Sequence, residues 1–547
     1  MSDSPRDAKV STEDSDFTRS ESLVKGMGQV VALWLLMFIY AGDPAPAVNE
    51  AHYLVKAKNY WDASYCANDL FAASGKAHTT FYLTFGWLTR FVSLEATAWI
   101  GRAVGWLLLA VGLRACCRST GLTTWASLAV LVLWVIGIER GNLAGEWVVG
   151  GIEGKVPAYG LALLGLSRVM RDDWRRAWIC FGAASAFHVL TGGWSVIAAS
   201  VAYVVMRIRE PGHQQRVPLA SMWKGLFIGG ALSLFGLIPA IALTMDADPS
   251  ESTLAARIYS YVRLRHHLLP GDFPWHWYAR HAVLVISLFL TLSLPNRSLA
   301  IRRVQSFALG ALLIAAAGLV VGCLPGIAPD LAAKLLRYYW FRLSDAVVPL
   351  ALALVIVEQC SAQVTRNQVL ASLVTAFGII AFISSVYGRV RQGVPPSARH
   401  DLLGIRSADV TDQQRSFQDW CAVCNWISVA MPEDEVLLTP RHQQTFKWYA
   451  GRAEVVNWKD VPQDAESLIQ WYERFEDVFP KRIGRVRLGS TRVPISYDRL
   501  RSYRDHYGVR FLLVDTRAAT SNLPLIKVYP AGEQKNETYH VYELPLD

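Results

Sequence analysis

The sequence predicts a mainly α protein: a polytopic bundle of about eleven transmembrane helices with a small soluble α/β domain at its C-terminus. Hydrophobic residues make up 52% of the 547 residues, and charged residues make up only 18%, whereas soluble domains average about 25% charged residues. The deficit is confined to the stretch from about Val24 to Tyr387, where apolar runs alternate with short basic segments. After Gly388 the composition is that of a soluble protein.

Apolar segments of roughly 20 residues are long enough to cross the hydrocarbon core of a bilayer. The expected spans, several of them short, are 24–42, 97–115, 122–138, 153–169, 176–190, 191–207, 223–244, 279–295, 304–323, 345–361 and 367–387. The pair joined at Thr191-Gly192-Gly193 is alternatively two half-helices that dip into the bilayer. Residues 79–93 are also apolar, but a span there would place Arg114 and Arg118 outside, so an interfacial helix is expected.

Arginines in the short loops set the orientation, because cytoplasmic loops carry an excess of positive charge. With a cytoplasmic N-terminus, every basic group falls on the cytoplasmic side, including Arg114, Arg118, Arg168, Arg171, Arg175, Arg176, Arg207, Arg209, Arg216, Arg297, Arg302, Arg303 and Arg366. An odd number of spans then places the C-terminal domain outside. The predicted organisation is a disordered cytoplasmic tail (1–22), a transmembrane bundle (23–389) with outer loops 43–96, 139–152, 245–278 and 324–344, and an extracytoplasmic domain (390–547).

The C-terminal domain alternates helix and strand patterns, which predicts an α/β fold. Helices are expected over 416–430, 445–451 and 464–479, strands over 435–439, 453–458 and 511–515, and a hairpin in the last 25 residues. The pair Cys421 and Cys424 lies within the first of these helices with no strand before it, so core packing is expected instead of redox chemistry.

The net charge of +9 does not indicate nucleic-acid binding, because most of the excess lies in loops between apolar runs. The first outer loop carries two carboxylates, Asp43 and Glu50, next to the membrane. Pro44 and Pro46 prevent a helix between them, and Asn49 is positioned to cap a helix that begins at Glu50. Such a pair can deprotonate a hydroxyl acceptor or hold a divalent cation. Alternatively, Asp43 marks a helix end and Glu50 lies in a first turn, stabilised by the helix dipole.

Cationic and histidine side chains gather in the later outer loops. Arginine suits phosphate, and histidine donates, accepts or binds metal. Alternatively, this segment lies at the membrane surface and binds lipid headgroups. Arg342 and Asp345 are three residues apart, so they either pair with each other or belong to a site. The residues of interest are Arg263, His266, His267, Arg337, Arg342 and Asp345, with His188 inside a span, whereas Glu139, Arg140 and Glu146 are expected to be exposed.

The segment from Asp43 through Asn49-Glu50-Ala51-His52-Tyr53-Leu54 is similar to the first-loop carboxylate motif of the GT-C glycosyltransferase superfamily. The layout resembles that superfamily too: an inside N-terminus, a long first outer loop with an interfacial helix, and an outer C-terminal domain. The chain also resembles, over nearly its whole length, an uncharacterised family of bacterial membrane proteins. This second resemblance is carried by NEAHYLVKAKNYW, FGWLTR, RLRHHLLP, YWFRLSD and TFKWYAGRAEVVNWKDVPQ.

The GT-C resemblance implies transfer of a sugar from a polyprenyl-phosphate donor at the outer face of a bacterial inner membrane. Membrane lipid and a lipid-linked sugar are then the partners, and nucleic acid is not one. In this picture Asp43 is the base or orients the acceptor, and Glu50 assists it or helps to hold Mg²⁺ or Mn²⁺. The donor phosphate is bound by Arg263, His266, His267, Arg337 and Arg342, supported by His52, His188 and Asp345.

The chain departs from the best-known pattern, because it lacks an adjacent Asp-Glu pair in the first loop and the tryptophan-aspartate signature of oligosaccharyl transferases. The alternative function is a non-enzymatic transporter or a scaffold for envelope polysaccharide assembly. A transporter should carry ionisable residues near mid-span in broken helices. Here they cluster at the outer ends of the spans, which favours chemistry at a surface.

Overall fold

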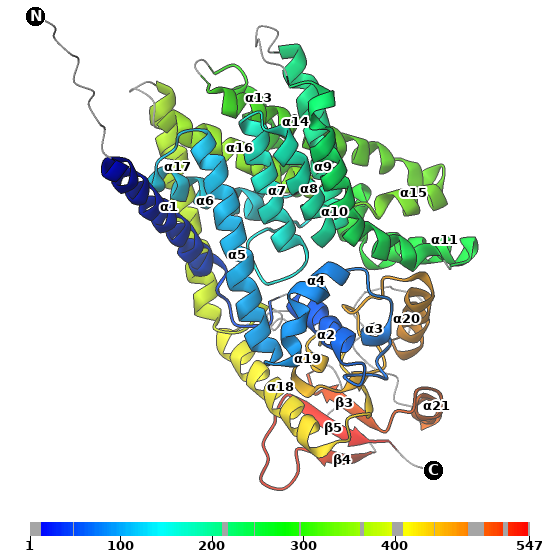
Figure 1. The fold of residues 1–547 in the computed structure, drawn as a ribbon. Helices are drawn as coiled ribbons and strands as arrows, with labels where there is room; N and C mark the ends of the chain where they lie inside the picture. Colours follow the sequence, from blue (N-terminus) through cyan, green and yellow to red (C-terminus); the bar gives the residue numbers. More distant parts are fainter. Residues whose placement is uncertain are drawn as a thin grey trace, which may run out of the picture.

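The computed structural model of this chain describes residues 12–47, 49–209, 217–245, 247–294, 297–360, 366–396, 409–441, 443–479, 497–517, 523 and 525–544. It has three parts, a bundle of long helices, a layer of short loop helices, and a C-terminal α/β domain, stacked in that order in Figure 1. The expected fold class, a polytopic helical bundle with a small α/β domain, is confirmed.

Each long helix of the bundle coincides with an expected apolar segment. They are α1 (Thr12–Ala41), α5 (Leu94–Ser119), α6 (Thr124–Gly141), α7 (Lys155–Met170), α8 (Trp174–Phe187), α9 (Val189–Arg209), α10 (Leu219–Met245), α13 (Trp275–Thr291), α14 (Leu299–Val321), α16 (Arg342–Cys360) and α17 (Arg366–Gln392). In the described part of the chain, eight helices are long and apolar enough to cross a membrane. Helices α7, α8 and α13 have 16, 14 and 17 residues, so the number of spans and their orientation stay predictions.

Two local expectations differ from the structure. Helix α1 begins at Thr12, within the stretch expected to be a tail, while residues 1–11 lie outside the described residues. The break between α8 and α9 falls at His188, whose backbone is extended, and not at Thr191–Gly193.

The apolar stretch 79–93 forms only the short helices α4 (Thr79–Thr84) and η1 (Gly86–Arg90), neither of which is long enough to span a bilayer.

Helix α10 is held against α8 by a stripe of glycines. A Cβ atom added at any of these glycines would lie 2.3 Å from a main-chain oxygen of α8, so only glycine permits the contact. The pairs are Gly225 with Arg175, Gly229 with Trp178 and Gly236 with Ser185. Close backbone approach through small residues is a common way to pack helices in lipid. Most of the remaining surface of α10 is apolar and exposed, as a lipid-facing helix requires.

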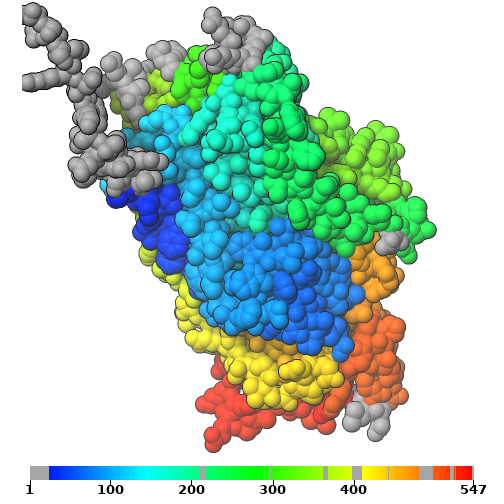
Figure 2. Space-filling model, viewed as in Figure 1, coloured from blue at the N-terminus to red at the C-terminus, as the bar shows by residue number. Residues whose placement is uncertain are grey.

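The loop layer lies between the bundle and the C-terminal domain. Its first part, coloured blue in Figure 2, packs against both. It contains α2 (Glu50–Trp61), α3 (Leu70–Ala73), α4 and η1. Its second part contains α11 (Pro249–Arg257), η2 (Ile258–Arg263), α12 (Arg265–Leu268), η3 (Pro270–Asp272), η4 (Leu324–Gly326) and α15 (Pro329–Leu336).

The C-terminal domain is a mixed five-stranded sheet with helices on both faces. Its elements are α18 (Val410–Ala430), β1 (Val436–Leu438), α19 (Phe446–Ala450), β2 (Ala453–Glu454), α20 (Ala465–Val478), α21 (Tyr497–Tyr507), β3 (Phe511–Asp515), β4 (Ile526–Tyr529) and β5 (Tyr539–Glu543). The strand order is β2-β1-β3-β5-β4, with β1 parallel to β2 and β3, and β5 antiparallel to β3 and β4. The expected helices, strands and hairpin are all present.

The two faces of this sheet follow the alternation of side chains along a strand. On β3, Leu513 packs on the side of α18, while Leu512 and Val514 pack on the side of α20 and α21. Cys424 lies in the α18 core, where burial raises the pKa of its thiol, so the expectation of a packing role agrees with its position.

Candidate functional site

A cavity of about 630 Å³ lies where the bundle, the loop layer and the C-terminal domain meet. One wall is apolar and is built from the ends of α8, α9 and α10. Its residues are Ala186, Phe187, Val189, Leu190, Gly236, Ala240 and Leu243. The facing wall is polar and comes from the loops and the C-terminal domain. The cavity therefore suits a ligand with an apolar part and a charged part.

A buried ion cluster forms the floor on the bundle side. The Nζ atom of Lys155, the first residue of α7, lies 2.8 Å from Glu146 Oε1 and 3.2 Å from Glu153 Oε1. The other oxygen of Glu146 lies 2.8 Å from Nε of Arg342. These groups balance in charge, which burial requires. The expectation that Glu146 is exposed is wrong, since the residue is 7% exposed and both its oxygens contact a cation.

The sequence spacing suggested an ion pair between Arg342 and Asp345 as one alternative, but the two residues do not form it. Asp345 instead accepts hydrogen bonds from the main-chain N–H groups of Leu143 and Ala144, at 2.8 and 2.9 Å. Those two residues begin the loop that carries Glu146. Asp345 therefore supports the site by holding this loop and does not touch the cavity, whose lining residues do not include it.

His188 occupies the break between α8 and α9 and contacts Arg342, with Nη1 of the arginine 2.8 Å from Nε2. A guanidinium only donates, so Nε2 accepts and the proton of a neutral ring lies on Nδ1. The Nδ1 atom faces Thr191, at 3.1 Å from its Oγ1 and 3.2 Å from its main-chain nitrogen. His188 thus contacts Arg342 beside the cavity, and its supporting role stays a prediction.

Three cations on the polar wall have no ion pair with a carboxylate among the described residues. Arg263, which is 6% exposed, donates to the carbonyl of Trp458 and lies over its ring. Arg337 lies over the ring of Tyr259. Lys459, from the C-terminal domain, is partly buried. Burial lowers the pKa of Arg263 to about 10, so it stays charged at neutral pH.

The pair His266 and His267 lies on the same wall but carries no charge at neutral pH. Burial lowers the pKa of His267 to about 3, and partial enclosure together with the charge of Arg263 lowers that of His266 to about 4. Nδ1 of His267 donates to the carbonyl of Ala144 at 2.7 Å. A neutral His266 can donate one hydrogen bond to a phosphate, whereas the single N–H of His267 is already taken by Ala144. Neither ring supplies the positive charge that the sequence suggested.

The two first-loop carboxylates lie away from the cavity, whose lining residues include neither of them. Glu50 is 1% exposed and accepts four hydrogen bonds: two from Arg102 at 2.6 Å, one from Ala47 N and one from Ile152 N. A carboxylate offers about four acceptor positions, so those of Glu50 are filled. Asp43 lies 3.7 Å from Nη1 of Arg389. Each carboxylate therefore belongs to a different arginine, and this geometry does not favour a shared cation.

Helix α2 nevertheless begins at Glu50, as expected, although Asn49 does not cap it. The Asn49 side chain instead donates to Glu153 Oε2 at 2.7 Å and lines the cavity. His52, one turn into α2, also lines the cavity, and its Nδ1 lies 3.3 Å from Asp460 Oδ1. The first loop thus contributes Asn49 and His52 to the site rather than its two acidic residues.

The sequence interpretation missed Glu153, Lys155 and Lys459. One signal was available for the first two, because Glu153-Gly154-Lys155 opens an expected span and charges at a membrane boundary are costly unless paired. Lys459 lies in the segment TFKWYAGRAEVVNWKDVPQ, and its pattern gives no indication that it faces helices more than 200 residues earlier in the chain.

Residues 418–478 match a family described as a domain of unknown function (DUF6798). No curated protein matches the sequence. Among solved structures, ArnT from Cupriavidus metallidurans bound to undecaprenyl phosphate aligns over 96% of this chain and 98% of its own, at 11% identity and a TM-score of 0.46. The arabinofuranosyltransferase AftD from Mycobacteria aligns over 95% of this chain and 41% of its own, at 13% identity and a TM-score of 0.45.

Proposed function

We propose that this chain is a membrane glycosyltransferase that takes a sugar from a polyprenyl-phosphate donor at the outer face of the membrane. One observation carries the proposal: a single cavity joins an apolar wall, made by the lipid-exposed helix α10 and its neighbours, to a wall whose cations form no ion pair with any carboxylate that the structure describes. A polyprenyl phosphate has the matching form, since its chain suits the apolar wall and its phosphate suits arginine.

The reaction needs a base for the acceptor and positive charge for the leaving group. The acceptor hydroxyl gives its proton to a carboxylate while its oxygen bonds to the anomeric carbon. The bond from that carbon to the phosphate oxygen breaks, and the phosphate leaves with the electron pair. Arg263 and Arg337 stabilise the charge that develops on the phosphate, where fixed cations contribute most to catalysis.

Glu153 is the better candidate for the base. Both oxygens of Glu146 already contact a cation, whereas Glu153 contacts one cation and one neutral amide. Lone-pair positions therefore remain on Glu153, and its side chain lines the cavity. Asp43 and Glu50, which the resemblance suggested for this role, are assigned instead to the packing of the first loop on Arg389 and Arg102.

The test is a transfer assay with purified protein, a polyprenyl-phosphate sugar labelled in the sugar, and an extract of membrane glycolipids as acceptor. Removal of a general base typically costs about 10²–10⁴-fold in rate. Glu153→Gln should lose at least a hundredfold in the rate per folded molecule, and Asp43→Asn should lose little. A wild-type protein that transfers no sugar, whatever the acceptor fraction, contradicts the proposal. Equal rates for Glu153→Gln and wild type remove Glu153 from the mechanism.

A further inference from the structure

The C-terminal domain presents a cation to the cavity from a loop that its own side chains hold rigid. This loop, residues 457–460, follows β2 and carries Lys459. The Asn457 Oδ1 atom accepts from the main-chain N–H groups of Lys459 and Asp460 at 2.8 and 2.9 Å. A side-chain amide that closes a turn in this way fixes the backbone of the residues that follow it. The direction in which Lys459 leaves the domain is therefore set by Asn457.

A buried charged network fixes Asn457 in turn. Its Nδ2 donates to Glu454 Oε1 and to Asp460 Oδ2. Both carboxylates also contact Lys447, whose Nζ lies 2.6 Å from Glu454, 2.8 Å from Asp460 and 3.1 Å from Asp69. Since Asp69 comes from the first outer loop, the network ties that loop to the C-terminal domain.

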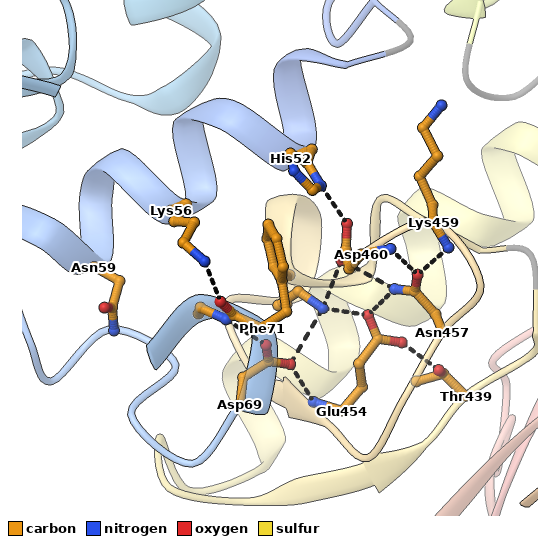
Figure 3. A network of polar contacts seen from close by, with 12 residues as sticks. His52, Lys56, Asn59, Asp69, Phe71, Thr439, Glu454, Asn457, Lys459 and Asp460 are labelled. Carbon is orange, nitrogen blue, oxygen red and sulfur yellow. Dashed lines mark hydrogen bonds and ion pairs between the residues drawn. The ribbon is translucent and has the colours of Figure 1, made fainter. Parts of the chain in front are cut away.

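Figure 3 shows the arrangement: the carboxylates and Asn457 point inward to one another, while the side chain of Lys459 points away from them. Lys459 lines the cavity together with Arg263, and no carboxylate forms an ion pair with it in the part of the chain that the structure describes. A partly buried ammonium that forms no ion pair is costly. An anion in the cavity would supply an ion-pair partner for it.

We propose that Lys459 is the group through which the C-terminal domain binds the phosphate of the lipid-linked donor, and that Asn457 and the Lys447 network are its positioning device. This inference rests on the proposed function, since it takes the cavity to be the donor site. It makes the C-terminal domain a part of that site, although Lys459 lies more than 200 residues after the helices that form the apolar wall.

The electrostatic surroundings of Lys459 give the inference a pH signature. Burial and the charge of Arg263 lower the pKa of Lys459 to about 8. The charged or titratable groups that face it are Arg263 on η2, His266 and His267 on α12, Glu153 and Lys155 at the start of α7, His52 on α2 and Asp460 on its own loop. Its positive charge is present below this pKa and is lost above it, so phosphate binding should weaken between pH 7 and 9.

The test measures binding of a polyprenyl phosphate and of the corresponding uncharged polyprenol to the full-length protein in phosphatidylcholine nanodiscs. A hydrogen bond between charged groups accounts for roughly a tenfold change in affinity or more. Lys459→Met should therefore lower the preference for the phosphate at least tenfold, and Lys459→Arg should retain it. The exposed Lys527 on β4 provides the matched control, because Lys527→Met removes the same charge from the same domain and should change nothing.

Two outcomes overturn the inference while leaving the proposed function intact: Lys459→Met prefers the phosphate as strongly as wild type does, or wild type and Lys459→Arg lose affinity equally between pH 7 and 9. Arginine keeps its charge over this range, so a phosphate-binding Lys459 predicts a flat profile for Lys459→Arg. Asn457→Ala should also weaken phosphate binding, because it frees the loop. A wild-type protein that binds phosphate and alcohol equally contradicts the proposed function itself.

Discussion

Removal of the Lys447 charge is the sharpest test of how the C-terminal domain is joined to the first outer loop. In Lys447→Met, the carboxylates of Asp69, Glu454 and Asp460 lose their common cation. All three are buried, with side chains 1–4% exposed. Breaking a buried ion pair by removal of one partner typically costs about 3–5 kcal/mol. In a domain of this size, each kcal/mol lost from the free energy of unfolding lowers the melting temperature by roughly 2–4 °C. We therefore expect the melting temperature of Lys447→Met to fall by about 10 °C.

The stability lost in Lys447→Met should increase as the pH rises. Burial and mutual repulsion raise the pKa values of carboxylates left without a cation above their unfolded values. A carboxylate whose pKa is higher in the folded protein than in the unfolded chain ionises more readily in the unfolded chain. As the pH rises, its ionisation therefore favours unfolding. Lys447→Met should therefore be closer to wild type at pH 5 than at pH 7.5. Glu454→Gln in the same background should recover part of the loss, because it removes one of the unpaired charges.

The assay is thermal unfolding of the full-length protein in detergent, followed by tryptophan fluorescence. Trp458 and Trp471 report on the domain, since both belong to or pack against its core. Glu454→Gln alone is the control, because it leaves Lys447 with two carboxylates and should cost much less than Lys447→Met. A melting temperature for Lys447→Met within about 2 °C of wild type, or a loss that does not change with pH, would refute the claim that this lysine holds the two segments together.

Three further predictions concern the first loop, the contact between α8 and α10, and the orientation of the C-terminal domain. Glu50→Gln should lower the melting temperature, because its four donors lose a charged acceptor, but should leave the transfer rate per folded molecule unchanged; a large loss of rate at unchanged stability would instead make Glu50 catalytic. Gly229→Leu should sharply reduce the yield of monodisperse protein in size-exclusion chromatography, while Gly230→Leu, which faces open space, should not; equal yields would refute the α8–α10 contact. A protease added to intact spheroplasts should cleave the C-terminal domain, because the proposed orientation places this domain outside the cytoplasm. Full protection of the domain would contradict that orientation.

Much of the fold follows from the sequence, because hydrophobic periodicity and length specify single elements. The apolar segments of the bundle and the strands at 435–439 and 511–515 are such elements. Periodicity and length do not predict the break at His188. This residue contacts Arg342, which lies more than 150 residues later in the chain. The imidazole at this break contacts Arg342, and no local pattern predicts that partner.

The site was harder to predict, because burial and pairing decide which charged residue is free to act. The cations Arg263, Arg337 and Arg342 do line the cavity. The acidic pair was interpreted without its arginines, although Arg102 within an expected span was a signal, since a buried arginine needs a counter-charge. Glu50 provides that charge. Lys459 could not have been found, because its position depends on the packing of two distant segments.

The most direct test of the account is a structure of the full-length protein determined with a polyprenyl phosphate bound. The account predicts the phosphate within hydrogen-bond distance of Arg263 and Lys459, with the lipid chain along the apolar wall formed by Ala240 and Leu243 of α10. A phosphate held beside Asp43 and Arg389, or a lipid chain that runs along another helix, would contradict it.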